Sequence, residues 1–238
     1  MTKTKFMLFT LFFLAVSVTA QAASIKGKVV YDGEAPKFRE LKLDADPICL
    51  SKHTEAVFPQ TLVLGDGQTI ANVFVHITKG VPKQAYTAPT EAVVVTQAGC
   101  MYDPHVFGAM VGQPVQFLNP DGTLHNVHAL SKINPEFNLA MPKFRTETTK
   151  TFDKPEFMFQ IKCDVHPWMA TYASIMDHPF FMTTKEDGNF EIADLPDGTY
   201  EVTAWHEKLG TMSQSVTIEA GQDFAEVNFT LSRPDKKN

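Results

Sequence analysis

The chain has 238 residues, of which 44% are hydrophobic and 20% charged. Because domains most often contain about 100–150 residues, this length leaves room for more than one compact unit. The formal net charge is −6 at pH 7. A mildly acidic chain of this kind is a poor candidate for binding nucleic acid.

The first 22 residues have the pattern of a signal peptide. Two lysines precede an apolar stretch at 6–18, and Ala-Gln-Ala follows at 20–22, which is the small-x-small pattern that precedes signal-peptidase cleavage. The apolar stretch is too short to span a bilayer, and no other stretch is long enough. We expect a periplasmic mature chain without a membrane span. Its formal charge becomes −8, because the lost segment carries two lysines and no acid.

Beyond the signal peptide, apolar residues alternate with polar ones and a helical period is almost absent. Such alternation occurs at 157–163, where Cys163 shares a face with Phe159 and Ile161, and again at 200–205 and 226–231. The pattern predicts an all-β protein.

One short helix is expected after Asp46, because an aspartate before Pro47 is a favourable helix start. Turns are expected at Asp187-Gly188 and at 196–198.

The three cysteines are an odd number for an exported chain, so one is left over if the others pair. We assign Cys163 as the unpaired cysteine and prefer a disulfide between Cys49 and Cys100. Two alternatives stay open at this point. In the first alternative, Cys49 and Cys100 are two free buried thiols. In the second, Cys100 binds a metal together with His105.

The loop at 163–169 reads Cys-Asp-Val-His-Pro-Trp-Met. Cys163, His166 and Met169 follow one another at intervals of three residues, so one tight loop can present all three side chains to a single point. His125, in the run Leu-His-Asn-Val-His at 124–128, supplies a second imidazole from a different strand. Two imidazoles, one thiolate and a weak thioether describe a blue-copper electron-transfer site.

Two other interpretations of these residues are weaker. Zinc accepts one cysteine and two histidines, but structural zinc sites prefer a closed tetrahedron of Cys and His, which leaves Met169 without a role. The other interpretation is a buried cysteine and methionine with surface histidines. It would require four ligand residues to fall in register by accident. A copper ion without an open coordination position has nowhere to bind a substrate. We therefore expect one copper ion, electron transfer and no enzymatic activity.

Residues 90–177 resemble the cupredoxins, in particular amicyanin and plastocyanin. The motifs are Cys-Asp-Val-His-Pro-Trp-Met at 163–169 and His-Asn-Val-His at 125–128, preceded by a plastocyanin-like spacing of Pro104, Gly112, Val115, Phe117, Asn119 and His125. The resemblance implies a Greek-key β-sandwich with copper held by His125, Cys163, His166 and Met169. It also implies that Asn126 braces the cysteine loop.

Further expectations concern the surroundings of this site. Val165 stands where amicyanin and plastocyanin have proline, so its N–H is free to point at the Cys163 sulfur and raise the reduction potential. His128 is expected to lie behind the copper ligands or at the surface and not to bind the ion. An auxiliary metal site made by His105 and His128 stays open.

The resemblance also implies that the His166 edge is exposed through an apolar patch. This patch would be lined by Pro167, Trp168, Met101 and Pro104. A c-type cytochrome or a periplasmic redox enzyme is the kind of partner that such a patch implies.

The flanks resemble a second family, the carboxypeptidase regulatory-like or transthyretin-like (prealbumin-like) β-sandwich. The similar stretches are 25–33, 72–75 and 183–200. Because 179–233 alone is too short for a sturdy core, we expect the cupredoxin to be inserted into this sandwich. The expected units are 1–22 (signal peptide), 23–89 and 179–233 (the two parts of the sandwich), 90–178 (cupredoxin) and 234–238 (tail). Three sequential units are the alternative.

Two rival functions stay open at this point. One is a copper-handling protein that binds and delivers the ion without changing its oxidation state. The other is a non-redox interaction module, suggested by the regulatory-like sandwich.

Overall fold

The computed structural model describes residues 22–234. The expected signal peptide at 1–22 lies outside this range except for its last residue, and so does the tail beyond residue 234. Within the described range the protein is all-β, as predicted, with one α-helix and two 3-10 turns. The elements are β1 (Ala23–Tyr31), α1 (Pro47–Ser51), η1 (Asp66–Gln68), β2 (Phe74–Lys79), β3 (Val93–Thr96), η2 (Ala98–Cys100), β4 (Val106–Met110), β5 (Val115–Leu118), β6 (His125–Ala129), β7 (Phe137–Met141), β8 (Glu147–Lys150), β9 (Glu156–Lys162), β10 (Ala170–Met176), β11 (Phe181–Thr183), β12 (Asn189–Leu195), β13 (Gly198–His206), β14 (Gly210–Ile218), β15 (Phe224–Glu226) and β16 (Phe229–Leu231).

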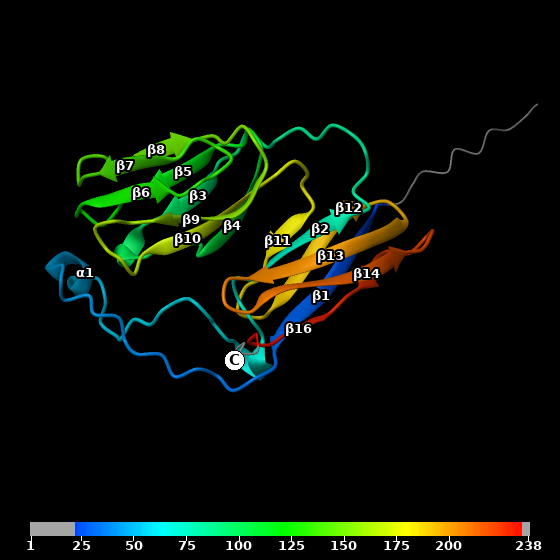
Figure 1. The fold of residues 1–238 in the computed structure, drawn as a ribbon, viewed down its shortest axis with the longest axis horizontal. Coiled ribbons are helices and arrows are strands. Elements are labelled where there is room, and N and C mark those ends of the chain that lie inside the picture. Colours follow the sequence, from blue (N-terminus) through cyan, green and yellow to red (C-terminus); the bar gives the residue numbers. More distant parts are fainter. Residues whose placement is uncertain (1–21, 235–238) are drawn as a thin grey trace, which may run out of the picture.

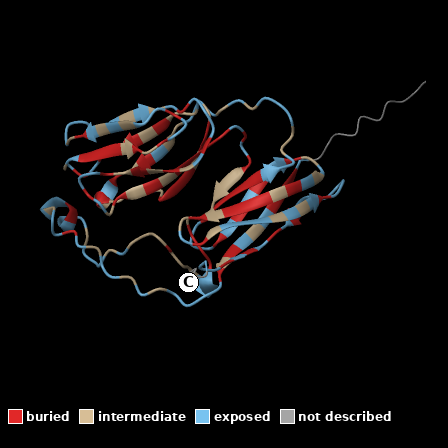
Figure 2. Ribbon diagram, viewed as in Figure 1, coloured by how far each residue is buried: buried red, intermediate tan, exposed pale blue. Residues whose placement is uncertain are grey.

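The strands form two lobes (Figure 1). In the first lobe, one sheet has the order β12-β1-β15, with β16 also paired to β1, and the other has the order β11-β2-β13-β14. In the second lobe, the sheets have the orders β4-β10-β9-β6-β7 and β3-β5-β8. The strands of both lobes contain buried residues (Figure 2), and each lobe has its own large apolar cluster.

The first lobe combines strands from both ends of the described chain. β1 pairs antiparallel with β12 and parallel with β15 and β16, and β2 lies between β11 and β13. Ile25, Val75 and Phe229 are fully buried in the cluster that these strands share. The two ends of the chain therefore contribute to one core. The division into domains at 89 and 178 stays a prediction.

The segment at 41–57, which we call the α1 loop, packs on the second lobe. Its ends are joined by a hydrogen bond from Leu41 N to Val57 O of 2.8 Å, and Leu43 and Cys49 are buried in the second lobe's cluster. The chain leaves β1, crosses to the second lobe and returns to β2 (Figure 1). The α1 loop thus contacts the second lobe, although the sequence analysis grouped it with the first sandwich.

The helix expected after Asp46 is confirmed as α1. The Asp46 carboxylate caps it by accepting a hydrogen bond from Ile48 N at 2.8 Å, and Pro47 occupies the first turn, where a missing N–H has no cost. No helix in residues 22–234 has the length and apolar character needed to cross a bilayer.

Strand β9 departs from the expected alternation at its start. Phe157 is 45% exposed, while Phe159 and Ile161 are buried as predicted. The pairing of β9 with β10 shifts register between Glu156 and Phe159. Met158 lies inside this shift, and its φ of +48° is unusual for a residue with a side chain. The Phe157 ring instead lies 4.9 Å from the His76 ring of the first lobe.

A small apolar cluster and a polar pair connect the two lobes. Phe74 of β2 packs with Val106 and Met176 of the second lobe. Beside them, His105 Nε2 lies 2.5 Å from Glu207 Oε1, and both side chains are almost fully buried. The lobes therefore contact each other through buried side chains.

Glu156, at the start of β9, holds the turn at 131–134. Its carboxylate accepts hydrogen bonds from the backbone N–H groups of Lys132 (2.6 Å), Ile133 (3.1 Å) and Asn134 (3.0 Å), and from the Ser131 hydroxyl. Although burial acts in the opposite direction, these bonds lower the pKa of Glu156 to about 2.

We expect Glu156→Gln to destabilise the protein by about 2 kcal/mol at pH 7, because the charge that accepts these bonds is lost. Since the folded-state pKa is lowered, this contribution is present above the ordinary glutamate pKa and is lost as the pH falls toward about 2. Urea unfolding of both proteins between pH 7 and pH 3 measures the difference. A difference that stays constant over this range would contradict the assignment.

Candidate metal centre

The loop at 163–169 connects β9 to β10 and is closed by its own backbone. Cys163 N donates to Met169 O at 3.1 Å, and Met169 N donates to His166 O at 2.9 Å. His125 is the first residue of β6, and β6 pairs with β9 at His128 and Lys162. The fold therefore places the second imidazole next to the end of the cysteine strand.

Three buried side chains converge at this point. His125 Nδ1 lies 3.0 Å from His166 Nδ1, and Cys163 Sγ lies 3.8 Å from the same His166 nitrogen. One ligand atom from each of the three residues lies within 4.8 Å of the others. Met169 is fully buried in the same cluster as Cys163. The structure thus brings together the three donors predicted from His125 and the cysteine loop.

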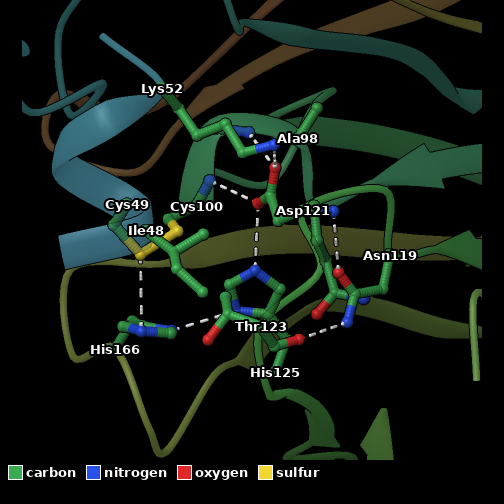
Figure 3. Close-up of polar contacts among 12 residues, drawn as sticks. Ile48, Cys49, Lys52, Ala98, Cys100, Asn119, Asp121, Thr123, His125 and His166 are labelled. Carbon is green, nitrogen blue, oxygen red and sulfur yellow. Dashed lines mark hydrogen bonds and ion pairs between the residues drawn. A yellow bond between two sulfur atoms is a disulfide. The ribbon is translucent and has the colours of Figure 1, made fainter. Parts of the chain in front are cut away.

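Each imidazole contacts a carboxylate through its other nitrogen. His125 Nε2 lies 3.0 Å from Asp121 Oδ2, and His166 Nε2 lies 3.1 Å from Asp46 Oδ2 (Figure 3 shows the His125–Asp121 contact). A neutral imidazole that donates from Nε2 has a lone pair on Nδ1. When both imidazoles are neutral, the two carboxylates leave two lone pairs facing each other beside a thiol, and this arrangement fits a soft metal cation.

The pKa shifts of the three donors differ in direction. Burial raises the pKa of Cys163, but hydrogen bonds from His125 and from the backbone of Asn126, His166 and Val165 outweigh it, so the pKa is lowered. Burial disfavours the charged form of His125, yet its bonds to Asp121 and Cys163 raise its pKa. Burial lowers the pKa of His166, and Asp46 opposes this only in part. The shifts thus favour the charged forms of Cys163 and His125 and the neutral form of His166.

Asn126 and His128 contact the loop through Asp164. Asn126 Oδ1 accepts from Asp164 N at 2.7 Å, and Asn126 Nδ2 donates to Asp164 Oδ2 at 3.1 Å. His128 Nδ1 lies 2.9 Å from the same carboxylate oxygen, and its Nε2 lies 3.1 Å from Glu136. Asn126 therefore fixes the position of Asp164, the residue that follows Cys163. His128 contacts the side chain of Asp164 and does not contact the three donors.

The expectation of an exposed His166 edge is wrong. Only 2% of His166 is exposed, because the α1 loop covers its Nε2 edge with Asp46 at 3.1 Å and with Cys49 Sγ at 3.5 Å (Figure 3 shows Cys49 above the ring). The α1 loop begins more than a hundred residues before His166, so no local pattern indicates this contact.

The residues expected to form the docking patch are only partly exposed. Pro167 is exposed, while Met101, Pro104 and Trp168 are intermediate. Trp168 turns inward enough to donate from Nε1 to Cys100 O at 3.0 Å. Its ring lies 5.2 Å from that of His166. Trp168 thus packs beside the imidazole that it was expected to frame at the surface.

Cys49 and Cys100 form a disulfide that attaches the α1 loop to η2, and Cys163 is the free cysteine among the described residues. Further contacts hold the α1 loop in place. Thr123 Oγ1 donates to Asp46 Oδ2 at 2.9 Å, and His53 Nε2 lies 2.7 Å from Gly99 O.

Asp46 and Asp121 are site residues that the sequence analysis did not assign to the metal. Asp121 precedes His125 by four residues, but this spacing has no special meaning outside a helix. Its carboxylate also accepts from Gly99 N and Cys100 N at 2.8 and 2.7 Å. Asp46 was identified only as a helix cap.

The structure does not join His105 and His128. His105 contacts Glu207 and the Ala170 carbonyl, whereas His128 contacts Asp164 and Glu136. Neither histidine belongs to a group of metal-ligand atoms in residues 22–234. Cys100 is likewise in the disulfide rather than beside His105.

The last strands match a known family. Residues 176–232 match the model of the carboxypeptidase regulatory-like domain, a range that runs from the end of β10 to β16. The C-terminal part of the chain is thus similar to a carboxypeptidase regulatory-like domain over these residues. A comparison with curated protein sequences found no match.

Several solved structures are similar to part of the chain. A Cu-containing nitrite reductase from Thermus scotoductus SA-01 is 21% identical, with a TM-score of 0.34 over 42% of this chain; the match covers 26% of the reductase. A Cu(I) structure of an amicyanin mutant is 24% identical, with a TM-score of 0.33 over 43% of this chain and 98% of amicyanin. A purple cupredoxin from Nitrosopumilus maritimus is 18% identical, with a TM-score of 0.29 over 35% of this chain and 99% of the cupredoxin.

Proposed function

We propose that this chain is a periplasmic blue-copper protein that carries single electrons between redox partners and is not an enzyme. The observation that carries the proposal is the meeting of His125 Nδ1, His166 Nδ1 and Cys163 Sγ inside the second lobe. These three groups, with Met169, would hold one copper ion. Copper in such a donor set supplies a one-electron Cu(II)/Cu(I) couple.

The surrounding residues keep the donors in one geometry. Asp46 and Asp121 hold both imidazoles so that Nδ1 faces inward, and Asn126 fixes the loop after Cys163. A site held by such outer contacts changes little when its charge changes, which favours electron transfer over substrate chemistry. Burial of all three donors keeps water and small molecules from the site.

The covered His166 edge changes the surface that a redox partner meets. A c-type cytochrome or a periplasmic redox enzyme would approach over the α1 loop, whose Ile48 and Leu50 are 39% and 53% exposed, and not over the bare imidazole. In the loop at 163–169, Asp164, Val165 and Pro167 are exposed. Small apolar surfaces of this kind suit weak, transient complexes.

A visible absorption spectrum of the mature protein tests the proposal. After addition of Cu(II), we expect an intense band in the red that ascorbate bleaches and re-oxidation restores. Cys163→Ser should lack the band, because the thiolate is lost. His178→Gln is the matched control, since His178 lies outside every group of metal-ligand atoms among the described residues, and it should keep the band.

Three outcomes would contradict the proposal. An intense band that survives in Cys163→Ser would exclude the thiolate as the copper ligand. A protein that retains exchangeable Cu(I) but never shows the band would be a copper-handling protein. A protein that binds no copper would leave the regulatory-like sandwich as the functional part.

A further inference from the structure

The disulfide lies against the metal centre on the side opposite Cys163. Cys49 Sγ is 3.5 Å from His166 Nε2, whereas Cys163 is on the Nδ1 side of the same ring. The two disulfide sulfurs and a ring nitrogen of His166 lie within 4.8 Å of one another, and all three residues are buried. His166 thus has sulfur donors on both of its nitrogens, as Figure 3 shows for the disulfide side.

Two thiolates and one imidazole form a soft donor set that suits Cu(I). In the disulfide, neither sulfur carries a thiolate, so the set is incomplete. We propose that reduction of the Cys49–Cys100 disulfide creates a second metal site, made of Cys49, Cys100 and His166 Nε2 and selective for Cu(I). This site is distinct from the one at Cys163, although it shares His166.

The reduction is a thiol–disulfide exchange with a dithiol. The dithiol attacks the disulfide and becomes oxidised to its own disulfide, while the S–S bond breaks and Cys49 and Cys100 each gain one electron and one proton. When Cu(I) binds, both thiols release their protons to solvent and the copper stays Cu(I). No electron is exchanged with the metal.

Contacts other than the disulfide keep the donors together after reduction. Asp46 accepts from Thr123 at 2.9 Å, His53 contacts the Gly99 carbonyl at 2.7 Å, and Leu43 is buried in the second lobe's core. The α1 loop is therefore attached at several points. After reduction, the Cys49 and Cys100 sulfurs need to move apart only by the difference between a covalent S–S bond and the spacing of two sulfur ligands on one ion.

The shared imidazole makes the two sites compete. A neutral His166 has a lone pair on only one ring nitrogen. When Nδ1 faces Cys163, Nε2 carries the proton that Asp46 accepts. When Nε2 binds Cu(I), the proton lies on Nδ1 and the contact with Asp46 is given up. Occupation of the second site therefore removes one imidazole from the first.

The test uses the full mature chain carrying Cys163→Ser, which removes the thiolate of the proposed blue-copper site. This protein is reduced with a dithiol, freed of reductant under argon and titrated with Cu(I) against a coloured Cu(I) chelator. We expect one tightly held Cu(I) per reduced chain and none for the oxidised chain. X-ray absorption should show two sulfur ligands and one nitrogen ligand.

Two variants supply the controls. In the Cys163→Ser background, His166→Gln should weaken Cu(I) binding at least about tenfold, whereas His178→Gln should not. Equal binding by the His166→Gln variant, no binding after reduction, or loss of the β-sheet circular dichroism on reduction would each overturn the proposal. The blue-copper proposal can fail independently, because its thiolate is absent from this experiment.

Discussion

Replacing both Cys49 and Cys100 by alanine is expected to lower the free energy of unfolding by about 4 kcal/mol. The disulfide joins residues separated by 51 positions. Its loss therefore increases the conformational entropy of the unfolded chain, because a long loop is no longer closed. The folded chain also loses the bond that attaches the α1 loop. Urea unfolding at pH 7 measures the effect.

Two controls isolate the disulfide in this experiment. Reduction of the unmodified protein should reproduce most of the loss without any change in sequence. Glu55→Ala changes an exposed residue of the same loop and should change stability by less than about 0.5 kcal/mol. Equal midpoints for the double variant and the unmodified protein would show that the disulfide does not hold the loop.

Phe117→Ala is expected to destabilise the second lobe by about 3–5 kcal/mol, because it leaves a cavity in a close-packed core. Phe117 is fully buried on β5, in the same cluster as Cys163. Phe229→Ala is the matched change in the first lobe, since Phe229 is fully buried in the other cluster. Both substitutions remove the same ring.

The two tryptophans allow the lobes to be followed separately. Trp168 lies in the second lobe and Trp205 on β13 of the first. In a Trp205→Phe background, fluorescence reports Trp168, and its urea midpoint should fall with Phe117→Ala. In a Trp168→Phe background, the midpoint should fall with Phe229→Ala. A loss below about 1 kcal/mol for Phe117→Ala would contradict the core assignment.

The features that the sequence predicted are those with a local pattern. Alternating apolar residues predicted strands such as β13 and β16, because a strand buries every second side chain. The three-residue spacing of Cys163, His166 and Met169 lies within one loop. The cap at Asp46 needs only Pro47 beside it, and α1 is present where expected.

The features that the sequence did not predict depend on distant parts of the chain. Asp46 contacts His166 across 120 positions. The sequence around either residue does not indicate this contact. The exposed Phe157 lies at a register shift between β9 and β10, and its ring packs against His76 of the neighbouring lobe. The burial of His166 could therefore not be inferred from the loop at 163–169 alone.

The position of β1 has a consequence for the order in which the chain assembles. Lys28 of β1 donates to Asn228, 200 positions later, while the strands of the second lobe all lie between 93 and 176. At about 5–20 residues per second, synthesis of the intervening chain takes roughly 10–40 s. During that time β1 has an unsatisfied edge, which is a template for wrong pairing. The first strand to be made is among the last to find its partners, and a chain that stops before residue 224 leaves it without β15 and β16.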